Sequence, residues 1–171
     1  MANVDNPHGF PVVDSLDGRP AYTRNYLKAS GDTKALGFND LVDALTAGTD
    51  IERRAAGGPF LGVNMSFGAA STATTHLVEI LTPASICEAQ TDASLVTADT
   101  GLIADVIADV APNSTTSISA QEIDSATEVV TGTLDFRLLR IAPYVGNASG
   151  TNSRWFCLCN DLRISDLKAG I

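Results

Sequence analysis

The chain has 171 residues, of which 44% are hydrophobic. This is enough to bury a full core and predicts one domain with peripheral segments. Its 20 acidic and 11 basic residues give a formal charge of −9, which disfavours nonspecific binding to nucleic acid or to an anionic membrane. The three cysteines do not form the disulfide framework of a secreted protein, so folding is expected in a reducing cytoplasm.

The charges are unevenly distributed. Residues 1–54 contain 8 acidic and 6 basic residues, residues 55–136 contain 10 acidic and no basic ones, and residues 137–171 contain 2 acidic and 5 basic ones. Either the acidic block only promotes solubility, or its loops face water, 112–127 above all, while basic residues meet an acidic partner. The cations then available for an interface are Arg19, Arg24, Lys28, Arg137, Arg140, Arg154 and Arg163.

An extended N-terminal arm is predicted over residues 1–20, and a β-rich domain over residues 21–171. The stretch 3–14, NVDNPHGFPVVD, contains prolines and a glycine that block a helix and discourage a central strand. It lacks the basic start and apolar run of a secretory signal, so we expect it to belong to the mature protein. Because its own apolar area is small, we expect residues 2–14 to be ordered mainly by a neighbouring chain.

Alternation of apolar and polar residues predicts strands in the rest of the chain. In TLDFRLLRI, 133–141, the alternation slips at Leu139, which indicates a β-bulge. RWFCLCN, 154–160, is apolar on both faces, which is typical of a strand with little solvent contact. Further strands are expected within 39–45, 60–67 and 75–81. The fold class is therefore mainly β, a single small barrel or sandwich.

Two segments are harder to interpret. Residues 97–110 carry apolar side chains at helical spacing, which allows one short helix, although Gly101 and the β-branched residues weaken it. Residues 112–127 are rich in serine and threonine and are expected to form a long surface loop.

The sequence offers no complete catalytic motif. Asn64-Met65-Ser66-Phe67-Gly68 is one substitution away from a nucleophile elbow, but Asn64 stands where the tight turn needs glycine. The two histidines, His8 and His76, are expected to be satisfied or exposed residues rather than general bases. We therefore expect a protein that is not an enzyme.

No cofactor or metal ion is expected either. Cys157 and Cys159 point to the same face of a strand, about 7 Å apart. Together with Cys87 they could ligate a metal, yet the spacing lacks the two-residue loop of zinc sites. Buried, unreactive free thiols are the favoured interpretation. The carboxylates lack the multi-oxygen loop that calcium needs.

The stretch MANVDNPHGFPVV resembles the N-terminus of head decoration, or capsid cement, proteins of tailed bacteriophages, many of which begin with a similar Asn-Pro-His-Gly-Phe stretch. AAGGPFLGVNMSF, LVTADTGLIADV and GTNSRWFCLCND extend the resemblance more loosely. It departs at Val13 and Asp14, where the family often has a basic residue after the Pro-Val step.

The resemblance implies a β-rich structural protein of the virion that is made in the host cytoplasm. It would bind the outer surface of the capsid and bridge neighbouring major capsid subunits, as a homotrimer, with no nucleic acid or membrane as partner. The candidate contact residues are Asn6, Pro7, His8, Phe10, Arg19, Arg24, Arg137 and Arg154.

Two alternatives remain open. A tail or baseplate component would share the β-rich fold, the acidity and the arm. A carbohydrate-binding β-sandwich could use SRWF and Tyr144 as a stacking platform, although Trp155 is expected to lie in the core.

Overall fold

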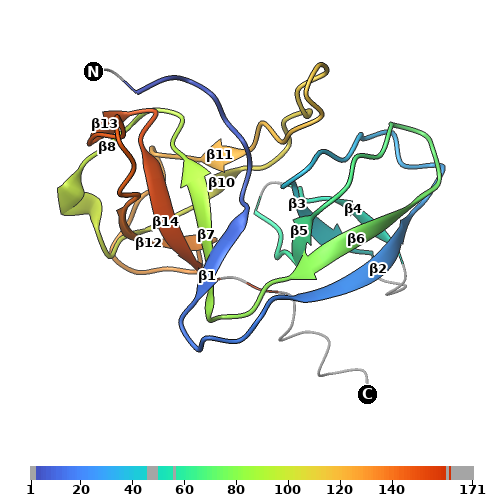
Figure 1. Cartoon of the computed structure of the whole chain (residues 1–171), viewed down its shortest axis with the longest axis horizontal. Helices are drawn as coiled ribbons and strands as arrows, with labels where there is room; N and C mark the ends of the chain where they lie inside the picture. Colours follow the sequence, from blue (N-terminus) through green and yellow to red (C-terminus); the bar gives the residue numbers. More distant parts are fainter. Residues whose placement is uncertain (1–2, 46–49, 56, 161, 163–171) are drawn as a thin grey trace.

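A computed structural model describes residues 3–45, 50–55, 57–160 and 162. Within these residues the fold is mainly β, with two five-stranded antiparallel sheets in a sandwich-like arrangement and no closed barrel. The two sheets form the two halves of the molecule in Figure 1. The first sheet has the order β1 (Val12–Ser15), β7 (Ser85–Gln90), β14 (Arg154–Cys159), β12 (Phe136–Ile141) and β9 (Ile103–Ala104). The second has the order β2 (Tyr22–Lys28), β6 (Thr74–Ile80), β5 (Gly62–Asn64), β3 (Leu41–Ala44) and β4 (Ile51–Arg53).

The strands predicted from alternation are present. β12 pairs with β14, and the register slips between Leu138 and Arg140, so the predicted bulge at Leu139 is confirmed. β14 lies between β7 and β12, with Trp155, Cys157 and Cys159 buried and the alternate residues half-buried. β3 and β5 lie within the ranges predicted for them, and β6 begins one residue before its predicted range, at Thr74.

The helix allowed over 97–110 is wrong except for a 3-10 turn at Thr97–Asp99 (η1). Gly101 follows this turn with φ +91°, a conformation that interrupts a helix. The next residues form β9 and β10 (Val106–Ile107), because β-branched residues pack better on a pleated surface than in a helix.

The long loop expected over 112–127 is also corrected. β10 pairs with β11 (Glu122–Ile123), and Ser119, Gln121 and Ile123 are buried. Gln121 donates to Ala108 O at 2.7 Å and accepts from Leu41 N at 2.6 Å. Its amide therefore satisfies backbone groups inside the protein, which explains how a polar segment can be buried. The pair of β8 (Ser94–Leu95) with β13 (Gly150–Thr151) completes the described strands.

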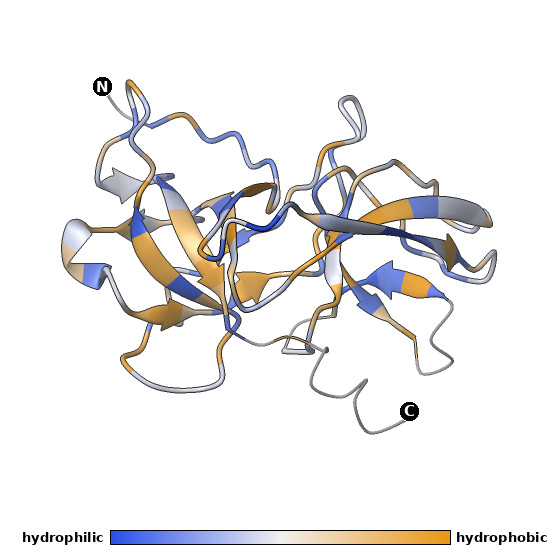
Figure 2. Ribbon diagram, turned by 60° about the horizontal axis from the view of Figure 1, so that its bottom comes forward, coloured by the Kyte–Doolittle hydropathy of each residue, from blue (hydrophilic) through white to orange (hydrophobic). Residues whose placement is uncertain are grey.

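The larger core lies between the first sheet and one face of the second. Phe10, Phe136 and Phe60 stack in sequence, with ring centroids 4.9 and 5.0 Å apart. A smaller core lies on the other face of the second sheet, around Val42 and Val78. Hydrophobic residues follow the strands, while much of the N-terminal arm is hydrophilic (Figure 2). No helix in the described residues is long and apolar enough to span a membrane.

Candidate functional site: an arginine face beside the N-terminal arm

The outer face of the first sheet carries three arginines. The pairing places Arg137 opposite Leu158, Arg140 opposite Phe156, and Arg154 opposite Gln90. Because the side chains of directly paired residues share a face, and because Cys157 and Leu138 point into the core, these arginines point away from the core. We call Arg137, Arg140, Arg154 and Phe156 the arginine face. The bulge at Leu139 allows Arg137 and Arg140 to share it.

The arginines are held by different contacts. Arg140 lies over the Phe156 ring, 5.2 Å from its centroid, and the Tyr144 ring meets Phe156 edge-on at 6.2 Å. Arg137 donates to Gly101 O at 2.6 Å. A cation over an aromatic ring keeps its charge and its hydrogen-bond donors. The face is therefore a local cationic surface on an acidic protein.

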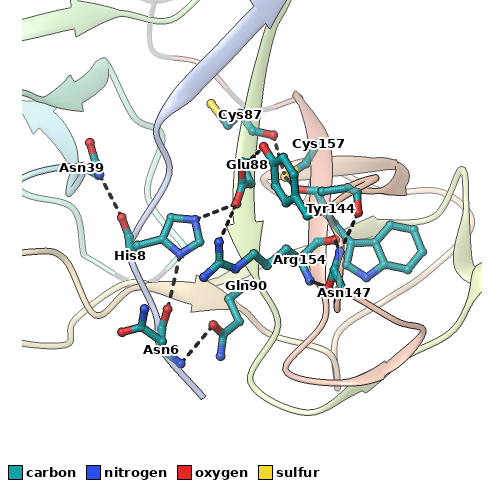
Figure 3. A network of polar contacts seen from close by, with 12 residues as sticks. Asn6, His8, Asn39, Cys87, Glu88, Gln90, Tyr144, Asn147, Arg154 and Cys157 are labelled. Carbon is teal, nitrogen blue, oxygen red and sulfur yellow. Dashed lines mark hydrogen bonds and ion pairs between the residues drawn. The ribbon is translucent and has the colours of Figure 1, made fainter. Parts of the chain in front are cut away.

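Glu88 joins this face to the arm (Figure 3). Its carboxylate lies 3.1 Å from His8 Nε2 and 3.6 Å from Arg154 Nη1, and it accepts from Tyr144 OH at 2.6 Å. Burial alone would raise the pKa of Glu88, but the contacts with His8, Tyr144 and Arg154 outweigh it and lower the pKa. Glu88 is thus an ionised anchor for three separate segments.

The arm lies against its own domain. Asn6 N donates to Gln90 Oε1 at 3.1 Å, His8 O accepts from Asn39 Nδ2 at 3.1 Å, and Asn3 pairs with Ala148 through its side-chain amide. Val12–Ser15 then pairs with β7. The expectation that a neighbouring chain mainly orders residues 2–14 is therefore wrong for residues 3–14, which this chain itself holds.

Gly9 and Phe10 fix the path of the arm. Gly9 has φ +71°, and a Cβ there would lie 2.3 Å from Asn39 O, so this close approach requires glycine. Phe10 is fully buried and its N donates to Asn39 O. The Asn-Pro-His-Gly-Phe stretch thus places Phe10 in the core and leaves Asn6 exposed, with Pro7 and His8 half-buried above it.

The other predicted cations lie elsewhere. Arg19 is 84% exposed beside Asp17, and Arg24 is exposed on β2 of the second sheet. Lys28 is fully buried and its ammonium lies 3.5 Å from Asp32, so it is not available for an interface. Arg163 falls outside the described residues. The structure therefore brings together Asn6, Pro7, His8 and Arg154 at one edge of the arginine face, with Arg137 on the same face.

The acidic block, whose loops were expected to face water, is partly neutralised within the fold. Asp135 is buried against Arg54, and Asp109 lies 3.0 Å from both Arg53 and Lys34. Glu88 lies 3.6 Å from Arg154. Opposite charges that are far apart in the sequence are close in space, which a count along the chain cannot reveal.

Ser66 and His76 meet, but not as a nucleophile and its base. Asn64 Nδ2 donates to Gly37 O and Ser66 O, so its Oδ1 faces His76 Nδ1 at 2.9 Å and Nδ1 carries the proton. His76 Nε2 then accepts from the Thr74 hydroxyl at 2.7 Å, while Ser66 Oγ lies 3.0 Å from the protonated Nδ1. Burial and the charge of Lys28 lower the pKa of His76. The prediction of a satisfied histidine is confirmed.

The three cysteines are free and buried, as predicted. Cys157 pairs directly with Cys87 across β14 and β7, and both Cys157 and Cys159 face the larger core. Burial raises the pKa of the Cys157 thiol. Trp155 is likewise fully buried, as predicted, and donates to Ser153 Oγ at 2.9 Å. In the described part of the chain, no group of three or more His, Cys, Asp or Glu side chains could hold a metal ion.

Comparison with known proteins does not identify this site. No family model matches the chain, and neither a curated protein nor a solved structure matches it. Sequence reasoning did not identify Glu88, the centre of the network, and named Tyr144 only for a sugar-stacking platform and not as a partner of Glu88. The signal for Glu88 was a single carboxylate inside the strand-length segment SICEAQ, where burial requires a partner.

The stability of the fold depends on pH through Glu122, which lies close enough to the arm to feel the charges of Asp5 and His8. Burial, then the charges of Asp5 and Asp92, raise the pKa of Glu122 from its ordinary 4.5 to about 7, against the pull of His8. Folding thus favours the protonated carboxyl, and its contribution to stability is present in full below pH 4.5 and lost as pH rises through 7. We expect Glu122→Gln to flatten part of the fall in the melting temperature between pH 4.5 and 8. Equal slopes for the variant and the natural chain would contradict this.

Proposed function

We propose that this chain is a non-enzymatic structural protein that binds the outer surface of a phage capsid and stabilises the head by bridging neighbouring major capsid subunits. The resemblance of the Asn-Pro-His-Gly-Phe arm gives the class of protein. The arginine face is the observation that supports a binding surface. It lies beside that arm and contains two of the predicted contact residues, Arg137 and Arg154.

The chemistry of this face suits an acidic, partly apolar partner. Arginine forms forked hydrogen bonds with carboxylates, and Tyr144 and Phe156 add aromatic area beside it. Val145 is fully exposed and Val4 is 77% exposed next to this edge. Each copy needs only a small interface, because many copies on a lattice gain avidity. The proposal includes that the protein lies on the surface of the virion and that it forms a homotrimer.

Co-sedimentation with heads that lack the protein tests it. We expect binding to fall as salt rises, since exposed ion pairs are screened. Arg137→Ala and Arg154→Ala should each weaken binding by about three- to tenfold, which is ~0.7–1.4 kcal/mol. Arg24, which is also a predicted contact, lies on the second sheet, so Arg24→Ala shows whether the interface extends beyond the arginine face.

Binding that is indifferent to salt and to both variants would remove the arginine face from the proposal. No binding to heads at all would overturn the capsid function. Light scattering on the purified protein separates a compact trimer from the large ring expected of a tail or baseplate component. Because Trp155 is buried, a sugar-stacking platform would have to rely on Tyr144, which is 43% exposed.

A further inference from the structure

An open groove of about 850 Å³ lies where the chain passes between the two sheets. One wall is β1 and the loop that leads to β2, and the other is the end of β6 and the loop that leads to β7. Figure 1 shows these two connections running side by side below β1. The groove is separate from the arginine face, which lies over β12 and β14.

Glu79 of β6 lines this groove with a carboxylate that lacks a counter-ion. Across the described residues, no hydrogen bond or ion pair reaches it. Burial raises the pKa of Glu79, as expected for a half-buried acid without a cation. Asp14 and Asp17 also line the groove, and Arg19 is paired with Asp17. The groove therefore favours a cation.

The walls of the groove also suit an extended backbone. β1 is an edge strand of the first sheet, and all four of its residues line the groove. An edge strand can accept a further strand through its unpaired backbone groups. The backbone groups of Ser15 are already used, because its N donates to Asp14 Oδ1 and its O accepts from Gly18 N, so a further strand would pair at the Val12 end of β1. Val13 is 42% exposed and Tyr22 is 63% exposed on the lining, so the groove has apolar contacts for alternate side chains of such a strand.

We propose that this groove binds an extended peptide segment of a partner protein that pairs with β1 and places a lysine or arginine side chain against Glu79. The backbone of β1 supplies the affinity that is independent of sequence, and Glu79 supplies the preference for a basic residue. This inference does not depend on the proposed function, because the partner is defined by the groove alone.

The test uses two fluorescein-labelled heptapeptides, Gly-Thr-Val-Lys-Val-Thr-Gly and its counterpart with glutamate in place of lysine. Fluorescence polarisation with the full chain should give saturable binding of the lysine peptide and at least tenfold weaker binding of the glutamate peptide. Glu79→Gln should weaken binding of the lysine peptide at least fivefold. Glu79→Lys should reverse the preference between the two peptides.

Glu52→Gln is the matched control, because Glu52 is a half-buried glutamate on β4, at the far edge of the second sheet. It changes the net charge by the same amount and should leave binding unchanged. An equal loss in the Glu52 and Glu79 variants would mean that general charge attraction holds the peptide, and the proposal would be wrong. No binding of the lysine peptide would also overturn it. Neither result involves heads, so the capsid proposal is tested separately.

Discussion

Replacing Phe10 with alanine is expected to lower the free energy of unfolding by about 3–5 kcal/mol, the usual cost of removing a large buried aromatic side chain. Phe10 is fully buried and stacks on Phe136, which in turn stacks on Phe60. Its removal would leave a cavity between the arm and both sheets. Chemical denaturation followed by Trp155 fluorescence measures the change.

The same arm offers a control for Phe10→Ala. Val4 lies in the same arm but is 77% exposed, so Val4→Ala should change stability by less than about 0.5 kcal/mol. If instead a neighbouring chain ordered the whole arm, Phe10→Ala would leave the unfolding of the isolated protein unchanged and would weaken only assembly. That outcome would contradict the packing described here.

The strands were predictable because their signal is local. The alternation in 133–141, including the slip at Leu139, depends on neighbouring residues and survives in the structure. β7 was not predicted, although all its residues are buried. Glu88 and Gln90 obscure the apolar pattern of this strand, and only their distant partners explain why they are inside.

The site could be predicted in part for the same reason. Charge alone predicts Arg137 and Arg154 as contact residues. That they share one face of the sheet follows from the pairing of β12 with β14 and from the bulge. The position of the arm was not predictable from its small apolar area. A single residue, Phe10, supplies the anchor, and its partner Phe136 comes from the far end of the chain.

Replacing Arg54 is expected to cause the second large loss of stability. Arg54 is fully buried, it forms an ion pair with Asp135, which is 2% exposed, and its Nε donates to Gly58 O. Asp135 also accepts from Val106 N at 2.9 Å, so the pair joins the end of β4 to β10. Arg54→Met should therefore cost about 3–5 kcal/mol at neutral pH, because it leaves a carboxylate buried without its cation.

The size of this loss should depend on pH in a known direction. Burial, opposed by Arg54, raises the pKa of Asp135 from 3.8 to about 6, so folding favours the protonated form and stability falls as pH rises through 6. Without Arg54 the pKa rises further, and the penalty of Arg54→Met should be smaller at pH 5 than at pH 8. Adding Asp135→Asn to Arg54→Met should recover part of the loss at pH 8.

Lys34→Met is the control. It breaks a contact with Asp109, which is 53% exposed, and should cost no more than about 1 kcal/mol. A loss in Arg54→Met that equals the Lys34 control, or that is the same at pH 5 and pH 8, would show that Arg54 does not stabilise the buried Asp135 carboxylate.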